Sequence, residues 1–220
     1  MDIDAVLKAM MDKKGSDLHV RPAGPVYARV NGELVALDGF NVADNKEVEA
    51  AAEKIMSPRA KRIFDSKAEC DFSYSVEGVG RFRFNVFRQR GFYSMVARAV
   101  SSIIPTLEDL KLPVGILQKM AMSHRGLILV TGVTGSGKSS TLASMIGHIN
   151  ANRNSHIITV EDPIEFLHSD RKSIISQREI GMDTMTFVDA LKAAMRQNPD
   201  VILVGEMRDL ETTQAALSAA

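Results

Sequence analysis

The sequence predicts an α/β protein built from two parts that differ in their patterns. The first hundred residues contain runs in which apolar and polar residues alternate, and these predict antiparallel strands mixed with helices. The remaining residues contain short, continuous apolar runs between helical segments, which predict a parallel sheet covered by helices on both faces. Pro105 and Pro113 mark the change from one pattern to the other.

The composition is that of a globular protein. The chain has 220 residues, of which 45% are hydrophobic, and 27 basic side chains balance 27 acidic ones. This balance argues against wholesale binding of nucleic acid. No run approaches the ~18 apolar residues that a membrane helix needs, so we expect neither a spanning segment nor a signal peptide. The single cysteine, Cys70, fits a reducing compartment, and we expect a cytoplasmic location.

The first part should combine helices with hairpins. Asn31-Gly32 separates two alternating runs, and because both residues tolerate positive φ angles, this dipeptide favours a type I′ turn. Gly78 and Gly80 separate two further runs, which we expect to pair as antiparallel neighbours. In chain order, we expect a helix over 3–10, strands over 26–30 and 33–37, helices over 46–56 and from 58 onward, and strands over 71–76 and 81–86.

The second part should follow a linker over 101–113. Within this linker, Thr106 to Asp109 has the form of a helix-capping signal. We therefore expect domains over 1–100 and 114–220, on either side of the linker. For the second domain we expect strands over 127–130, 157–160 and 201–204, and helices over 139–150, 187–196 and from 210 onward.

The most specific motif is a glycine-rich loop between the first of these strands and the first of these helices. It satisfies the pattern G-x-x-x-x-G-K-[ST], which points backbone N–H groups into one concavity that fits a nucleotide's phosphates. Lys138 should lie near the β- and γ-phosphates, Ser139 should coordinate Mg²⁺, and Ser140 should assist toward the α-phosphate. A chance match is expected in roughly one chain in a hundred of this size. The loop residues are Gly132, Val133, Thr134, Gly135, Ser136, Gly137, Lys138 and Ser139.

Hydrolysis also needs an acidic group that holds the metal or orients water, and two places offer one. The apolar run 201–204 leads to Glu206, the form of a Walker B strand, so Glu206 is expected to face Mg²⁺. The apolar run 157–160 leads to Glu161, Asp162 and Glu165, at the edge where parallel sheets bind their ligands. Spacing does not choose between Glu161 and Glu165 as the water-activating base. Without the phosphate loop, solvated carboxylates or helix caps would be the simpler interpretation.

The segment 78–107 is rich in arginine and contains no acidic residue. On a strand, Arg81 and Arg83 share one face, while Phe82 and Phe84 share the other, which should turn inward. A row of guanidinium groups can bind ATP phosphates, nucleic acid or the carboxylates of another subunit. A merely solvated basic face is the alternative. The other arginines of the segment are Arg88, Arg90 and Arg98.

Several segments together resemble the type II/IV secretion ATPase superfamily, and most closely its pilus-retraction motors of the PilT/PilU type. Shorter phrases at 15–18, 80–83 and 104–113 are similar as well, so the likeness covers essentially the whole chain. The resemblance implies a PAS-like N-terminal domain followed by a RecA-like P-loop NTPase domain. The main segments are 132–139, 158–166, 177–184 and 202–212.

The resemblance also implies a function. It implies a hexameric ring that hydrolyses ATP with Mg²⁺ to drive pilin disassembly, pilus retraction and twitching motility. Its implied partners are five further copies of the chain, the platform protein of the pilus in the inner membrane and a related retraction ATPase, without direct contact to nucleic acid. The implied location is the cytoplasmic face of the inner membrane.

Site roles carry over by position. Lys138 and Ser139 match the Walker A pair, Glu206 matches the Walker B glutamate, and Glu165 matches the catalytic glutamate of the acidic box. The resemblance thus chooses Glu165 where spacing does not. It also implies that Arg81 and Arg83 act as arginine fingers on ATP bound by a neighbouring subunit, with Arg88 and Arg98 as further candidates.

One departure concerns the segment after Ala220, where the family continues into a histidine box and further strands. We therefore expect a domain that is C-terminally incomplete, and a chain that is weakly active or inactive alone. A pilus-assembly or type II secretion ATPase is the alternative within the superfamily. A RecA-like nucleic-acid-binding protein and a regulatory subunit that binds ATP without hydrolysing it are the alternatives from other classes.

Overall fold

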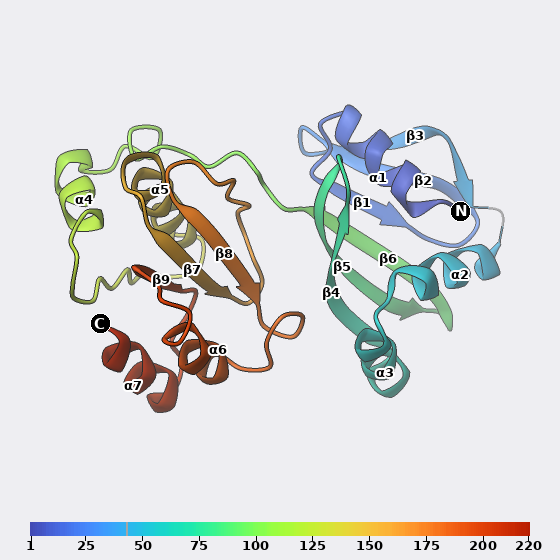
Figure 1. Cartoon of the computed structure of the whole chain (residues 1–220). Helices are drawn as coiled ribbons and strands as arrows, with labels where there is room; N and C mark the ends of the chain where they lie inside the picture. The colour runs from blue at the N-terminus through green and yellow to red at the C-terminus, as the bar shows by residue number, and fades with distance from the viewer. Residues whose placement is uncertain (43) are drawn as a thin grey trace. The chain divides into compact units, whose positions relative to one another are not determined.

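The computed structural model describes residues 1–42 and 44–220. Contacts divide the chain into two compact units, Met1–Val100 and Ser101–Ala220, which are described separately (Figure 1). Within the described residues, no helix is both long enough and apolar enough to cross a membrane.

The first unit is a six-stranded antiparallel sheet with three helices. The strand order is β3-β2-β1-β6-β5-β4, so the outer strands belong to the two hairpins that flank the central pair β1 and β6. The strands are β1 (Asp17–Val20), β2 (Gly24–Val30), β3 (Glu33–Val42), β4 (Glu69–Val76), β5 (Gly80–Gln89) and β6 (Phe92–Ala99). The helices are α1 (Ile3–Asp12), α2 (Asn45–Ile55) and α3 (Pro58–Lys67).

The core of this unit lies between the helices and one face of the sheet. Phe82 and Phe84 of β5 are completely buried, whereas Arg83 between them is exposed, as the alternation predicts. Phe84 stacks on Phe72 of the neighbouring strand β4. From α1, Leu7 and Met10 complete the same core. The opposite face of the sheet is therefore left to polar side chains.

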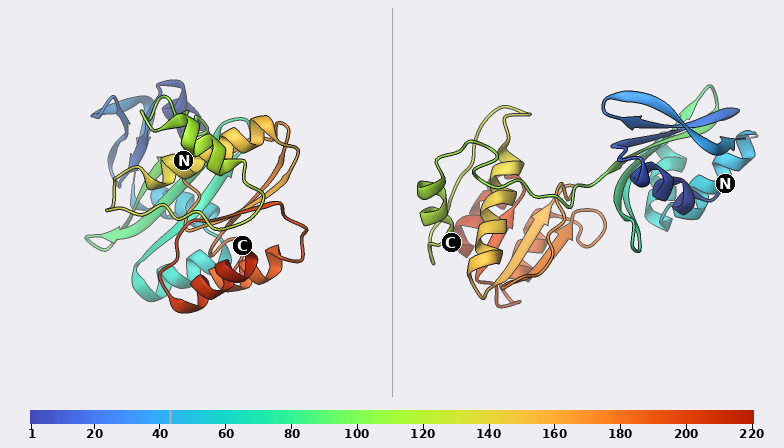
Figure 2. Two further views of the ribbon diagram at one scale, coloured as in Figure 1. Left: turned by 90° about the vertical axis from the view of Figure 1, so that its left-hand side faces the viewer. Right: turned by 90° about the horizontal axis from the view of Figure 1, so that it is seen from above.

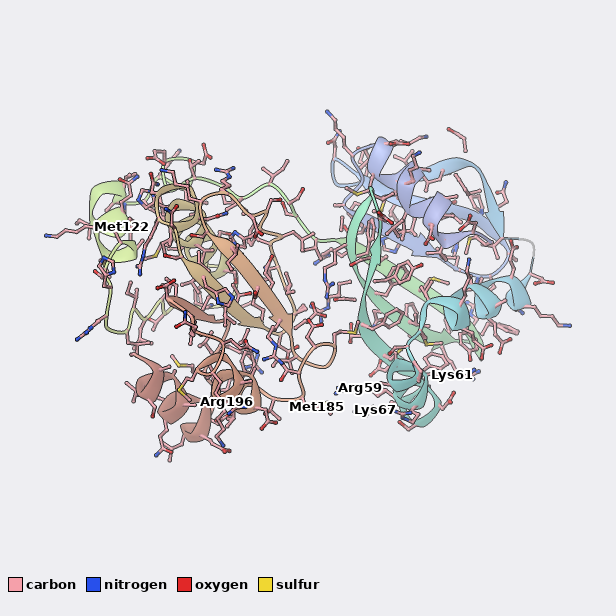
Figure 3. The ribbon with its side chains drawn as sticks, in the orientation of Figure 1. Arg59, Lys61, Lys67, Met122, Met185 and Arg196 are labelled. Atoms are coloured by element: carbon pink, nitrogen blue, oxygen red, sulfur yellow. The ribbon has the colours of Figure 1, made fainter. Side chains whose placement is uncertain are left out.

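Local signals determine where these elements begin and turn. Asn31 has φ 50° and Gly32 has φ 88°, which confirms the type I′ turn between β2 and β3. Ser57 caps α3 by accepting a hydrogen bond from the N–H of Ala60, and a proline follows it at the first helical position. The cations Lys61 and Lys67 project from the exposed side of α3 (Figure 3).

The second unit contains a three-stranded parallel sheet with the order β8-β7-β9. Ile157 of β7 packs toward α5, while Ile158 and Val160 pack toward α6, so the central strand is covered on both faces (Figure 2). The strands are β7 (His156–Glu161), β8 (Ile174–Glu179) and β9 (Val201–Val204). The helices are α4 (Val114–Ala121), α5 (Lys138–Asn152), α6 (Phe187–Ala194) and α7 (Leu210–Ala219).

One sequence expectation for this unit was wrong. The run 127–130 belongs to no strand in the described part of the chain, and Leu129 is 60% exposed. Thr106 and Asp109 do cap each other's backbone N–H groups, at 2.9 and 3.1 Å, but they close a turn and not a helix. The capping hydrogen bonds that the sequence indicates are therefore present.

Candidate functional site

The glycine-rich loop leads directly into α5. Gly137 is the N-cap of this 15-residue helix and has φ 92°, and Gly135 has φ 79°. A side chain at either position would strain the backbone, so glycine is required for the turn. An added Cβ would meet nothing within 4 Å at either glycine, which leaves the space beside the loop open. The Thr141 hydroxyl donates to the carbonyl of Gly137 at 2.9 Å and anchors the first helical turn.

Lys138 folds back over this loop. Its Nζ donates to the carbonyl oxygens of Gly132 and Val133, at 3.0 and 2.9 Å. The ammonium group is therefore held at the loop and adds its charge to the positive end of the helix dipole. Ser139 and Ser140 follow it in the first turn of α5, and both are partly buried. The arrangement concentrates positive potential where a phosphate would bind.

The fold brings this loop to the edge of the sheet where the strands end. Helix α5 ends at Asn152, and β7 begins at His156, so the short connection makes the helix run back antiparallel to the strand. Met145 and Ile149 of α5 pack with Ile157 of β7. The start of α5 and the carboxyl end of β7 therefore lie at the same edge, which is where open parallel sheets bind their ligands.

Glu161 is the last residue of β7, and its carboxylate is held by several donors. Its Oε1 accepts from the Thr159 hydroxyl at 2.6 Å and from the Gln177 amide at 3.2 Å. The backbone of Glu165 also donates to this carboxylate. Burial raises the pKa of Glu161, and the hydrogen bonds from Thr159 and Gln177 oppose this rise without cancelling it. Glu161 is thus a constrained carboxylate with an increased tendency to hold a proton.

Glu165 has a different environment from that of Glu161. Its side chain is exposed, although its neighbours Ile164 and Phe166 are buried or partly buried. Its carboxylate therefore meets solvent from a backbone whose flanking residues are packed into the unit. The structure therefore gives the two glutamates distinct positions, a difference that spacing alone could not reveal.

Glu206 follows β9 and pairs with a neighbouring cation. Its Oε2 lies 2.8 Å from the Nη2 of Arg208, whose side chain is 80% exposed. The preceding residue, Gly205, extends the pairing of β9 with β7, because its N–H donates to the carbonyl of Val160 at 2.8 Å. A Cβ at Gly205 would lie 3.2 Å from the Cα of Glu161. The two acidic strand ends therefore pack closely.

The predicted arginines lie on the polar face of the sheet in the first unit. Arg83 pairs in register with Arg98 of β6, and Arg98 pairs with Asp17 of β1, which in turn pairs with Arg29 of β2. We call these four residues the arginine row. Arg83 also lies 3.7 Å from Asp71 of β4. Arg81 is next to the row on the same face and donates to the Ser75 hydroxyl at 3.3 Å.

Two predicted arginines lie elsewhere. Arg88, at the far end of β5, faces the rings of Phe64 and Tyr93, at 5.4 and 5.0 Å. Arg90 occupies the hairpin turn after β5 with φ 52°. Neither belongs to the arginine row. Arg88 therefore lies apart from Arg81, Arg83 and Arg98, the other candidate arginine fingers that the resemblance implies.

Sequence reasoning missed several residues of the site. No role was predicted for Asp17, although its side chain is only 8% exposed and it carries the one negative charge of the arginine row. Thr159 and Gln177 were not considered because their roles depend on contacts between strands. The Nδ1 of His168 is buried and has no hydrogen-bond partner in the described part of the chain. A polar residue inside an apolar strand, such as Thr159, is the one signal that sequence offered.

The residues present fit a nucleotide with Mg²⁺. Gly135 and Gly137 leave open space beside a cationic loop, which suits a phosphate chain. Among the described residues, no group of three or more His, Cys, Asp or Glu side chains could hold a metal. The sequence predicts Ser139 and Glu206 as the protein ligands of the metal.

A glycine-rich phosphate loop at the start of a helix, beside a parallel sheet that ends in carboxylates, defines the class of P-loop α/β proteins. The model of the family "Type II/IV secretion system protein" matches residues 94–220. The chain belongs to this family.

Two similar relatives are pilus ATPases. The chain is 42% identical over 220 residues to the type IV pilus ATPase PilU of Pseudomonas aeruginosa and covers 57% of its length. It is also 42% identical over 220 residues to the type IV pilus retraction ATPase PilT of the same organism and covers 63% of its length. In both cases the whole of this chain is matched, so it spans less than two thirds of each relative.

A solved structure matches the fold. The crystal structure of the pilus retraction motor PilT with bound ADP superposes on the whole chain with a TM-score of 0.88 and 44% identity, and the chain covers 64% of that structure. The α/β fold class that the sequence predicts is thereby confirmed, as is the resemblance to motors of the PilT/PilU type.

Proposed function

We propose that the intact protein is a Mg²⁺-dependent ATPase that works as a homo-hexameric motor and powers retraction of type IV pili and twitching motility. The observation that carries this proposal is the phosphate loop at the start of α5, at the same sheet edge as the carboxylates after β7 and β9. The likeness to relatives named as pilus ATPases supports the choice of process.

ATP with Mg²⁺ would supply the transferable γ-phosphoryl group and a divalent charge that offsets the negative charge of the phosphates. The backbone N–H groups of 135–139 and the Lys138 ammonium would bind the phosphates, and Ser139 and Glu206 would hold the metal. Glu206 would have to exchange its ion pair with Arg208 for this contact, which costs little because Arg208 is exposed.

Glu165 is the residue that we assign as general base. Its exposed carboxylate would orient the attacking water and accept its proton. Glu161 would support it, because the Glu161 carboxylate accepts a hydrogen bond from the Glu165 backbone and so fixes the turn between them. The exposed Glu165 would thus act on the attacking water, and the constrained Glu161 would position Glu165.

Arg81 and Arg83 are assigned to the ATP that a neighbouring subunit binds. Arg83 lies on the polar face of the first unit with a side chain that is 49% exposed, so its guanidinium is accessible to another subunit. Arginine fingers of this kind stabilise the charge that develops on the γ-phosphate. We place the ring at the cytoplasmic face of the inner membrane, where it would engage the pilus platform protein and a related retraction ATPase.

Two variants of the intact protein test the assignment. We expect Lys138→Ala to abolish binding of MgATP in calorimetry. We expect Glu165→Gln to retain binding and to lose turnover, while Glu108→Gln, an exposed glutamate in the same unit, leaves turnover unchanged. Normal turnover by Glu165→Gln would show that the general base is another residue. If calorimetry detects no heat when MgATP is added to the unaltered protein, the proposed function as an ATPase motor is refuted.

A pilus-assembly or secretion ATPase is the second candidate, because the matched family includes type II as well as type IV systems. Deletion of the gene distinguishes the two. Loss of a retraction motor leaves surplus surface pili without twitching, whereas loss of an assembly motor leaves no surface pili. The interpretation as a nucleic-acid-binding protein loses support, because Phe82 and Phe84 are fully buried and cannot stack on bases.

A further inference from the structure

The segment that carries Glu165 is bound to β8 through side chains of that strand, which come from alternate residues. We call residues 162–168 the acidic loop. Gln177 and Glu179 of β8 lie two residues apart, so their side chains project from the same face of the strand. Both reach the backbone of the acidic loop, which passes over this face.

Three backbone groups of the loop are bound in this way. The carboxylate of Glu179 accepts from the N–H of Ile164 at 3.1 Å. The amide of Gln177 donates to the carbonyl of Phe166 at 2.9 Å and accepts from the N–H of His168 at 2.8 Å. Residues 164, 166 and 168 are therefore each bound by a side chain of β8, while the loop also forms a backbone bridge between Phe166 and Ser101, whose carbonyl accepts from the N–H of Leu167 at 2.9 Å.

Glu165 lies between the first two of these fixed points. With the N–H of Ile164 and the carbonyl of Phe166 both bound, the backbone at Glu165 has little freedom to rotate. Gln177 also donates to Glu161 at 3.2 Å, and the Glu161 carboxylate accepts from the Glu165 backbone. One glutamine side chain thus connects both ends of the turn that presents Glu165.

We propose that Gln177 is a positioning residue for the hydrolytic step: it holds the acidic loop in the conformation that places the Glu165 carboxylate, and Glu179 assists it. This proposal rests on the proposed function, in which Glu165 is the general base. Gln177 acts only through Glu165, so it should affect the rate of hydrolysis without affecting nucleotide binding, which depends on the phosphate loop.

Two variants of nearly equal size separate the contacts. Gln177→Met removes all three hydrogen bonds of the side chain. Gln177→Glu keeps the acceptor for the His168 N–H but removes the donations to Phe166 and Glu161. Gln214→Glu, the same exchange on the exposed face of α7, is the matched control.

We expect kcat of the intact protein to fall about 10²-fold in both Gln177 variants, since a displacement of about 1 Å at a catalytic group can cost this much. KM for MgATP and the calorimetric Kd should stay within twofold of the unaltered protein. Amide hydrogen exchange supplies a readout without turnover: the His168 amide should exchange faster in Gln177→Met and remain protected in Gln177→Glu.

A double-mutant cycle decides whether Gln177 acts through Glu165. With Glu165→Gln already present, Gln177→Met should cause no further loss of the residual turnover. An unchanged kcat in both Gln177 variants, or a full additional loss in the Glu165→Gln background, would overturn the proposal. Failure of the proposed function would look different, because Glu165→Gln alone would then retain turnover.

Discussion

Arg98 donates from its Nε to the carboxylate of Asp17 at 2.7 Å, across the pairing of β6 with β1. Asp17 also accepts from the Ser16 hydroxyl at 2.8 Å and lies 4.0 Å from the Nε of Arg29. Burial acts to raise the pKa of Asp17, but the hydrogen bonds from Arg98 and Ser16 outweigh it, and the pKa is lowered. The arginine row is therefore held together by one buried negative charge.

Asp17→Asn should destabilise the first unit because it leaves the guanidinium groups of Arg29 and Arg98 facing each other without a carboxylate. We expect a loss of about 1–3 kcal/mol in the free energy of unfolding, as for other buried charged partners. Denaturant unfolding measures it. Asp38→Asn, whose side chain is 92% exposed and pairs with Lys13, should change stability by no more than about 0.5 kcal/mol.

Because the pKa of Asp17 is lowered, its contribution to stability should depend on pH. A carboxyl whose folded-state pKa is below its unfolded value stabilises the fold above the unfolded pKa, and loses this contribution as the pH falls through the folded value. The difference in the free energy of unfolding between Asp17→Asn and the unaltered protein should therefore be constant near neutral pH and shrink below about pH 4. An equal difference at all pH values would contradict the role of the charge.

Gly205 is required by the close packing of the two acidic strand ends. In Gly205→Ala the new methyl group would lie 3.2 Å from both the Cα of Glu161 and the carbonyl oxygen of Val160, so the backbone must shift. We expect turnover to fall about 10²-fold, because small displacements near reacting groups have effects of this size. Steady-state kinetics on the intact protein measures this loss.

The control for Gly205→Ala is Gly147→Ala in α5. Its added Cβ would meet only Ile104, at 3.6 Å, which is an ordinary contact. Alanine is also favoured over glycine within a helix by up to about 1 kcal/mol. This variant should therefore be as stable as the unaltered protein or more so, with normal turnover. Equal losses in both variants would mean that packing at Gly205 has no special effect on the site.

His168 should make stability fall in mild acid. Burial lowers the pKa of its imidazole to about 4, below the ordinary value of about 6.5. Between these values the unfolded chain binds a proton that the folded chain does not, so stability decreases as the pH falls from about 6.5 toward 4. Above that range His168 contributes no dependence on pH.

His168→Leu should weaken this dependence, because leucine does not titrate. The quantity to compare is the change in Tm between pH 7 and pH 5, not the Tm itself, since the substitution also alters packing. His124→Leu, at an exposed histidine, should leave the change in Tm as it is in the unaltered protein. If His168→Leu loses as much Tm in acid as the unaltered protein, another group is responsible.

Sequence was sufficient where an element depends on its own residues. The turn at Asn31-Gly32 needs only the positive φ angles of two residues, and β5 needs only the alternation of phenylalanine with arginine. The glycine-rich loop carries its own geometry in the same way, which is why its link to α5 was predictable. These features are local, and tertiary contacts do not overrule them.

Sequence was insufficient where a residue's role depends on what lies opposite it. The run 127–130 has the composition of a strand, but a strand also needs a partner backbone. Gln177 lies in a segment that carries the resemblance, but its role was not predicted, because its hydrogen bonds depend on a loop that returns over β8. Asp17 likewise is significant only because register places two arginines beside it.

The last prediction concerns whether the arginine row acts on the nucleotide of another subunit. Arg83→Gln removes one guanidinium from a partly exposed position and leaves the buried phenylalanines unchanged. If Arg83 acts as an arginine finger, kcat should fall by about 10³-fold or more while MgATP still binds, since fingers act on the charge that develops during transfer. Arg21→Gln, at an exposed arginine of the same unit, should keep normal turnover.

Mixing two inactive proteins shows whether the finger and the phosphate loop belong to different subunits. Arg83→Gln retains the loop, and Lys138→Ala retains Arg83, so a mixed ring contains some sites where an intact loop meets an intact arginine from its neighbour. We expect each variant alone to be inactive and the mixture to regain part of the turnover, with a maximum near equal proportions. If both residues had to come from one subunit, no mixture could restore activity, and the arginine row would then serve the subunit that carries it.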